Sequence, residues 1–253
     1  MCILRYNNVE TESGSSTPED AVAPDLDWSR SFFQRPDGEV KHLFNENELM
    51  RALCLLDKET MNSKNLRKVL PLRVIAINGY VSLTSLGNCP TISQITYILD
   101  PHVSPRWKIE EKLKRSIEAI AAYLGYDKSW MSSYTGRMSE RLRQALWTES
   151  LDQNVVIWAG QNLTVYAPLW EWMLDEKMKA LAGAAPYVDK QDLTDAVDVV
   201  SKLNQKYKKV ISADLLAHRH RRIQPPVRMA MYYNLNQWYE EKYHKPGLTF
   251  KEQ

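Results

Sequence analysis

Four neutral, hydrogen-bonding side chains lie in or near two apolar runs in the first half of the chain: Asn78, Ser82, Gln94 and Thr96. Amide and hydroxyl groups can polarise a substrate carbonyl, and each well-aimed donor contributes up to about 3–4 kcal/mol to transition-state stabilisation. They are poor anchors for Mg²⁺, which usually needs at least one carboxylate. The pattern favours metal-independent chemistry, with Asn78, Gln94 and Thr96 as candidate catalytic residues.

Aromatic side chains are the second unusual feature, because eight Trp and thirteen Tyr stand against only four Phe. Such rings line small-molecule pockets and interfaces, although they also occur in ordinary cores. A pocket lined by them can hold a flexible polyene in a reactive shape, which supplies roughly 7–11 kcal/mol in favourable intramolecular cases. The candidate substrate-binding residues are Ser82, Tyr97, Trp158, Tyr166, Trp170, Trp172 and Lys177.

Two apolar runs must position these residues. Residues 72–77 read LRVIAI and precede Asn78-Gly79, and residues 92–99 read ISQITYIL. This order predicts a buried strand, a tight turn, a short helix and a second buried strand. Gly79 permits a sharp turn and a close approach by another group. The expected fold is α/β (α+β), with a small mixed sheet flanked by helices.

This stretch resembles the core of the nucleotidyltransferase fold, in the degenerate branch that includes AbiEii-type toxins and related fungal proteins. In that family the first strand ends in Gly-Gly or Gly-Ser, and the next strand carries an Asp-x-Asp pair that holds magnesium for nucleotidyl transfer. The resemblance places Gln94 and Thr96 where the two aspartates stand, and Asn78 where the first glycine stands. It therefore implies a nucleotidyltransferase-like fold with no metal site and no cofactor.

The resemblance extends over about residues 45–205. Strand-like runs at 153–158 and 162–167 contain no Asp or Glu, although the family often places a third metal carboxylate there. The helix opened by Pro168 carries Lys177, at the position of a lysine that the resemblance implies binds phosphate. Residues 190–195, KQDLTD, resemble the family's Lys-Asp-x-x-Asp motif. The alternative is that Lys177 and the first aspartate are ordinary helix charges.

Three regions organise the rest of the chain. We expect a polar, loosely attached arm at 1–27, an α/β core at 28–183 and a helical region at 184–253 packed on that core. The segment 126–136 is predicted to be a loop. The basic run 218–222 either grips a phosphate or carboxylate or forms a solvated turn. Apolar spacing predicts helices at about 45–57, 109–124, 138–147, 193–207, 212–217 and 227–243.

Composition excludes several classes of protein. A formal charge of +2 over 253 residues gives no reason to expect a nucleic-acid partner. Cys2, Cys54 and Cys89 lie far apart, so neither a disulfide framework nor a zinc site is expected, and a reducing, cytoplasmic setting is favoured. No secretory signal and no apolar run of membrane-spanning length are seen, so we expect no membrane partner.

Three functions stay open at this point. The first is cofactor-independent cyclisation of a small apolar polyene or terpenoid by a pericyclic, Diels–Alder-type reaction of natural-product biosynthesis. The second is a non-catalytic pseudoenzyme that acts as a binding or regulatory module. The third is residual nucleotidyl transfer through other carboxylates, such as Asp100 or Asp152. A deep closed pocket favours the first, and a shallow cleft beside a broad apolar patch favours the second.

Overall fold

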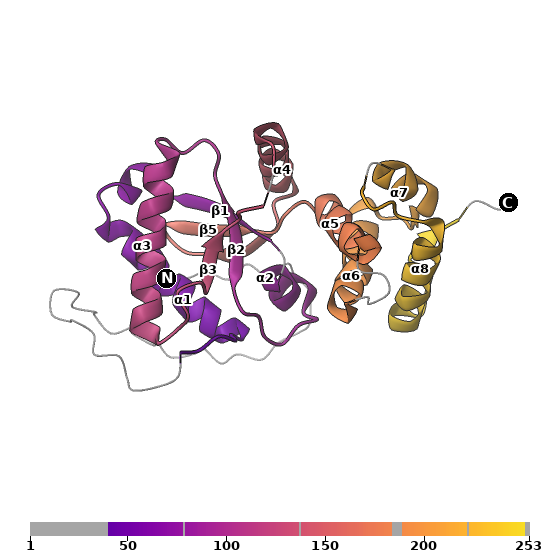
Figure 1. Ribbon diagram of the computed structural model, residues 1–253, viewed down its shortest axis with the longest axis horizontal. Helices are drawn as coiled ribbons and strands as arrows, with labels where there is room; N and C mark the ends of the chain where they lie inside the picture. The colour runs from indigo at the N-terminus through magenta and orange to yellow at the C-terminus, as the bar shows by residue number, and fades with distance from the viewer. Residues whose placement is uncertain (1–39, 78, 137, 184–188, 222, 251–253) are drawn as a thin grey trace, which may run out of the picture.

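The computed structural model describes residues 40–77, 79–136, 138–183, 189–221 and 223–250. The expected N-terminal arm and Asn78 lie outside the described residues. Figure 1 shows an elongated arrangement, with a sheet and its helices at one end and a group of helices at the C-terminal end.

A five-stranded mixed sheet, in the order β3-β2-β1-β5-β4, forms the centre of the first part. The strands are β1 (Leu72–Ile77), β2 (Ile95–Leu99), β3 (Met131–Ser133), β4 (Val156–Ala159) and β5 (Leu163–Tyr166). The central strand β1 pairs antiparallel with β2 and parallel with β5. The mixed α/β class, the β1 prediction and the β4–β5 hairpin are confirmed, whereas β3 lies in the segment predicted to be a loop.

Between β1 and β2, the chain forms a short helix, α2 (Gly79–Val81), which continues as a π-helical turn, η2 (Ser82–Leu86). A Cβ atom on Gly79 would lie 3.1 Å from Ile92 Cγ2, so the predicted close approach at this glycine is confirmed. Before β1, a single 3₁₀ turn, η1 (Leu66–Val69), leads into the strand.

Helices α1 (Glu46–Asn62) and α3 (Arg106–Leu124) cover one face of the sheet, and Leu53, Leu113 and Val74 share a hydrophobic cluster there. Asn45 begins α1 in a capping box with Glu48, and Gly125, at φ 70, ends α3. Helix α4 (Glu140–Gln153) packs on the other face, where Leu146 and Trp147 meet Ile75 and Ile98. The structure thus confirms the caps and helices expected at these positions.

The second part consists of α5 (Trp170–Gly183), α6 (Lys190–Tyr207), α7 (Ala213–His220) and α8 (Met229–Tyr243), with a small parallel pair of β6 (Ile211–Ser212) and β7 (Leu248–Thr249). Leu174 and Met178 of α5 share a cluster with Val200 of α6 and Tyr232 of α8. The boundary that the sequence predicts at residue 184 lies between α5 and α6, and α5 packs with α6 and α8. No described helix has both the length and the apolar character needed to cross a bilayer.

Candidate functional site

Gln94 and Thr96 lie on the sheet face that α4 covers. Thr96 stands opposite Ile77 of β1 and Ser132 of β3. Gln94 immediately precedes β2, and its side chain lies beside those of Thr96 and Ser132. Gln94 Nε2 lies 3.4 Å from Thr96 Oγ1, and Ser132 Oγ lies 3.5 Å from Gln94 Oε1. These long contacts join three neutral groups, so the structure brings the two predicted catalytic residues together.

Tyr166 also belongs to this face, because it stands opposite Ile75 in the register of β5 with β1. It packs against the hydrophobic cluster that contains Trp172 and Ile98.

The carboxyl group of Asp100 directly follows β2. Its Oδ2 lies 2.7 Å from Arg73 Nη2, and its Oδ1 accepts a hydrogen bond from the His102 amide. Among the described residues, no group of three or more His, Cys, Asp or Glu side chains could hold a metal ion.

Tyr97 and Trp158 lie on the opposite face, in the cluster formed with α1 and α3. Each is 2% exposed. Trp170 belongs to a third cluster, with α5 and α6. The structure therefore does not bring these three residues together with Gln94 and Thr96, which corrects our expectation of one aromatic-lined cleft. The separation of Tyr97 from Thr96 follows from their adjacency on one strand.

Ser82 and Lys177 meet at the contact between the two parts of the molecule. Lys177 Nζ lies 2.6 Å from Asp195 Oδ2 and 2.8 Å from Asp192 Oδ1. Ser82 Oγ donates a hydrogen bond of 2.8 Å to Asp195 Oδ2. Burial alone would lower the pKa of the Lys177 ammonium, but the charges and hydrogen bonds of Asp195 and Asp192 outweigh burial and raise it. Lys177 is therefore a charged group that is already neutralised by its neighbours.

The same network extends along α6 to α8. Gln191 Nε2 donates to Asp195 Oδ1 and Asn88 Oδ1, at 2.9 and 3.0 Å. Asn88 Nδ2 donates to Asp198 Oδ2 at 2.6 Å, and Asp198 Oδ1 also accepts from Lys242 and from the Tyr243 hydroxyl. Sequence reasoning missed Asn88, Gln191 and Asp198, although the acidic repeat at 192, 195 and 198 places three carboxylates on one helix face. These hydrogen bonds and ion pairs join α6 to the sheet-containing part of the molecule and to α8.

The described part of the basic run at the end of α7 is mixed: His218, Arg219 and Arg221 are exposed, whereas His220 is buried. Arg219 donates to both carboxylate oxygens of Asp175, with Nε 2.8 Å from Oδ1 and Nη2 2.8 Å from Oδ2. His220 is 1% exposed, with Nε2 2.8 Å from Asp175 Oδ1 and Nδ1 2.7 Å from the Tyr232 oxygen. Tyr232 is fully buried. This row of groups links α5, α7 and α8, with His220 and Tyr232 buried and Arg219 reaching the surface.

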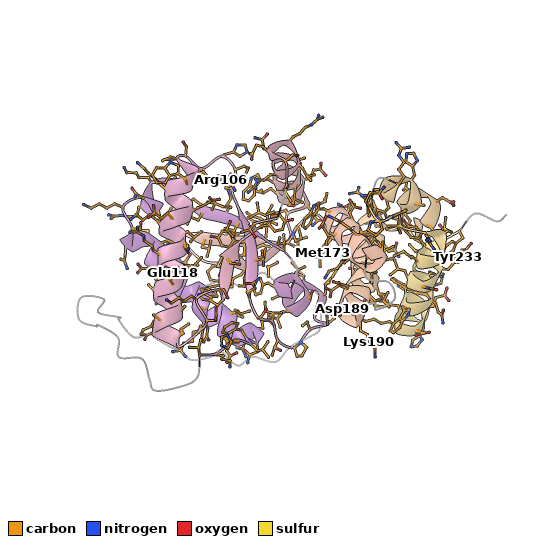
Figure 2. The ribbon with its side chains drawn as sticks, in the orientation of Figure 1. Arg106, Glu118, Met173, Asp189, Lys190 and Tyr233 are labelled. Atoms are coloured by element: carbon orange, nitrogen blue, oxygen red, sulfur yellow. The ribbon has the colours of Figure 1, made fainter. Side chains whose placement is uncertain are left out.

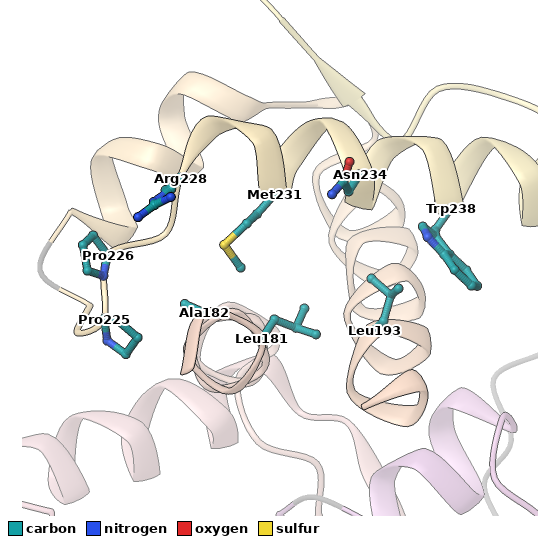
Figure 3. Close-up of a pocket in the computed structure, with 9 residues that line it drawn as sticks. All are labelled: Leu181, Ala182, Leu193, Pro225, Pro226, Arg228, Met231, Asn234 and Trp238. Carbon is teal, nitrogen blue, oxygen red and sulfur yellow. The ribbon is translucent and has the colours of Figure 1, made fainter. Parts of the chain in front are cut away.

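A cavity of about 560 Å³ opens between the end of α5, the start of α6 and the outer part of α8. Figure 3 shows Met231 pointing from α8 toward Leu181 and Ala182 of α5. The volume lies in the range of small-molecule sites, which are mostly apolar and carry a few polar groups. Arg228 and Asn234 supply such polar groups. The lining residues are Leu181, Ala182, Leu193, Pro225, Pro226, Arg228, Met231, Asn234 and Trp238.

Comparison with known proteins adds no relative. No protein-family model matches the sequence, and neither the curated proteins nor the solved structures include a match. The likeness to the nucleotidyltransferase fold therefore stays a prediction from the residues of the chain.

Proposed function

We propose that this protein is a binding module that takes up a small, largely apolar molecule and performs no nucleotidyl transfer. The observation that carries the proposal is the cavity of about 560 Å³ between α5, α6 and α8. Leu181, Leu193 and Met231 give it apolar walls, which favour a hydrocarbon or aromatic ligand body.

The groups at the nucleotidyltransferase-like positions argue against nucleotide chemistry. Gln94 and Thr96 are neutral, and Mg²⁺ is ordinarily held by carboxylate oxygens. Lys177 is paired with Asp195 and Asp192, so binding a triphosphate there would break two ion pairs in a largely buried place. A scaffold of this kind can keep its shape after the loss of its reaction.

One end of the ligand is expected to be anionic. Arg228 lines the cavity and makes no ion pair with any residue that the structure describes. A guanidinium group matches the geometry of a carboxylate or sulfonate, and Asn234 supplies a neutral amide on the same helix. We therefore expect an apolar acid to bind better than an apolar base.

The test uses the environment-sensitive probe 8-anilinonaphthalene-1-sulfonate, which combines aromatic rings with one negative charge. We expect Met231→Trp to fill the cavity and weaken probe binding by roughly tenfold, since the larger ring occupies the ligand's space. The matched control is Met229→Trp, on the same helix but outside the cavity lining, and it should bind like the wild type. Equal probe binding by both variants would refute the site.

The second arm of the test titrates the protein with ATP, GTP, CTP and UTP in the presence of Mg²⁺ or Mn²⁺. We expect no heat of nucleotide binding that depends on the metal ion. Asp152 is exposed and is one of the carboxylates that could serve residual nucleotidyl transfer. If a nucleotide binds only with metal, and Asp152→Asn abolishes that binding, the residual nucleotidyltransferase hypothesis is restored.

Cyclisation of a polyene or terpenoid is a second candidate, favoured by the uncharged row of Gln94 before β2, Thr96 in β2 and Ser132 in β3. These amide and hydroxyl groups could orient a carbonyl without a metal. Incubation with a conjugated polyene aldehyde, followed by product chromatography, tests it. Gln94→Ala should slow product formation and the exposed Gln144→Ala should not; a rate no faster than in buffer would remove the candidate.

A further inference from the structure

A second cavity, of about 590 Å³, lies between α3 and the edge strand β3. It is separate from the cavity of Figure 3 and shares no lining residue with it. One side comes from a single face of α3, where the lining positions 110, 111, 114, 117 and 118 recur at helical spacing. The lining residues are Tyr97, Glu110, Glu111, Lys114, Ile117, Glu118, Lys128, Ser129, Met131, Ser132, Ser133 and Thr135.

The floor of this cavity is apolar except for one phenol group. Tyr97, Ile117 and Met131 are each 2% exposed and all three line it. No described residue forms a hydrogen bond with the Tyr97 hydroxyl. The Tyr97 oxygen is not among the fully enclosed side-chain atoms that lack a partner, so it has accessible surface where Tyr97 lines the cavity. The Tyr97 hydroxyl is therefore available to a ligand that enters the cavity.

The charges around the cavity are mostly paired along α3. Glu110 accepts from Arg106 at 2.9 Å, Glu111 pairs with Arg115, and Glu118 lies 3.8 Å from Lys114. Figure 2 labels Arg106 and Glu118, which mark opposite ends of this row on the helix. Lys128 is exposed and makes no ion pair with a described residue. It is the cation at the mouth that can accept an anionic ligand group.

The two polar features lie toward opposite ends of the cavity. Tyr97 stands opposite Ser133 in the β2–β3 register. Burial and the negative charge of Glu110 both raise the pKa of the Tyr97 hydroxyl. The hydroxyl therefore lies toward the Glu110 end of the cavity. Lys128 precedes Trp130, whose indole Nε1 donates to the Ile117 carbonyl at 3.1 Å, near the Glu118 end. Eight residues of helix separate these ends, which corresponds to about 12 Å.

We propose that this cavity binds an elongated amphiphile with a neutral hydroxyl or carbonyl oxygen at Tyr97, an apolar middle and a carboxylate at Lys128. The neutral group is required at the deep end because Glu110 disfavours a second negative charge there. The apolar middle lies against Ile117 and Met131. The inference is independent of the function proposed for the other cavity.

Three probes of one chain length separate these contributions: ω-hydroxydecanoate, decanoate, which lacks the hydroxyl, and the decane-α,ω-diol, which lacks the carboxylate. Calorimetric titration of the full chain with each probe gives the affinities. We expect Tyr97→Phe to weaken ω-hydroxydecanoate roughly threefold to tenfold, the effect of one hydrogen bond, and to leave decanoate unchanged. Lys128→Ala should weaken both carboxylates roughly twofold to fivefold and leave the diol unchanged.

Matched control variants show whether a change in affinity is specific to the cavity residues. Tyr134→Phe removes a phenol on the opposite face of the sheet, and Lys112→Ala removes an α3 lysine outside the cavity lining, so neither should change an affinity. Met231→Trp, which fills the other cavity, should also have no effect. The inference is overturned if none of the probes binds, or if Tyr97→Phe weakens decanoate as much as ω-hydroxydecanoate.

Discussion

Lys177 of α5 and Asp195 of α6 face each other across the contact between the two helices, with 2.6 Å between Nζ and Oδ2. The Asp195 side chain is 1% exposed, so this is a buried ion pair. Ser82 and Gln191 donate further hydrogen bonds to the same carboxylate. A buried charge pair is tolerated when additional hydrogen bonds satisfy it, and here those bonds come from two elements, η2 and α6.

Replacement of Lys177 by Met should destabilise the protein by about 3 kcal/mol, because the carboxylate of Asp195 is left buried without its cation. The remaining hydrogen bonds from Ser82 and Gln191 keep the loss at the lower end of the range for such pairs. Urea denaturation followed by circular dichroism measures the change in the free energy of unfolding. Lys179→Met, an exposed lysine of the same helix, is the control and should change stability by less than about 0.5 kcal/mol. Equal losses in the two variants would show that the ion pair carries no stability.

Much of the fold was predictable because local signals agreed with the packing. Residues 72–77 form a strand buried almost throughout, so its apolar run needed no alternation to be recognised. Asn45 and Gly125 marked a helix start and a helix end through the hydrogen bonds and backbone angle that such positions require. β3 was missed because three residues, Met131–Ser133, are too few to show a period.

The candidate site was harder to predict, because it depends on strand register. Gln94 and Thr96, two residues apart, contact each other in the structure. A register shift between Val156 and Trp158 places the first opposite Tyr166 and the second opposite Val165, on different faces. One extra residue in a strand reverses the side to which later side chains point. The run QNVVIW contains no Gly or Pro that would indicate such a bulge.

Gly160, in the turn between β4 and β5, is expected to tolerate no side chain. A Cβ atom there would lie 2.4 Å from Asp57 Oδ1. That carboxylate accepts hydrogen bonds from the amides of Asn162 and Leu163, both at 2.7 Å, so it cannot move without releasing them. We expect Gly160→Ala to lower the free energy of unfolding by about 1–3 kcal/mol in urea denaturation.

The control for this substitution is Gly183→Ala at the end of α5, where the nearest atom to an added Cβ is 3.8 Å away. Its effect on stability should be within about 1 kcal/mol of zero. A Gly160→Ala variant as stable as Gly183→Ala would mean that the Asp57 contact is easily rearranged.

Asp175 should make stability depend on acid pH. Burial would raise the pKa of its carboxyl group, but hydrogen bonds and charges from His220 and Arg219 outweigh burial and lower the pKa below its ordinary value of 3.8. The stabilisation is therefore complete above about pH 4 and is lost as the pH falls through the lower pKa of the folded state. At pH 7, Asp175→Asn should cost about 1–3 kcal/mol, the range for hydrogen bonds to charged groups.

The measurement is urea denaturation of the wild type and Asp175→Asn at a series of pH values from 7 to about 2.5. The difference between them should narrow as the pH falls below 3.8. Asp152→Asn, at an exposed position on α4, should follow the wild type throughout. A difference that stays constant down to the lowest pH would show that charge on Asp175 contributes no stability.

Truncation of Trp158 should destabilise the protein much more than truncation of Gln94, although both are candidate site residues. Trp158 is buried against the α1 and α3 side of the sheet, so Trp158→Ala should cost about 3–5 kcal/mol in the free energy of unfolding. Gln94 is half-buried, and its side-chain hydrogen bonds to described residues are long, at 3.4 and 3.5 Å, so Gln94→Ala should cost less than about 1 kcal/mol. Thermal denaturation of both variants distinguishes the roles. A Trp158→Ala protein that keeps the stability of the wild type would mean that this indole packs at a surface site and not in the core.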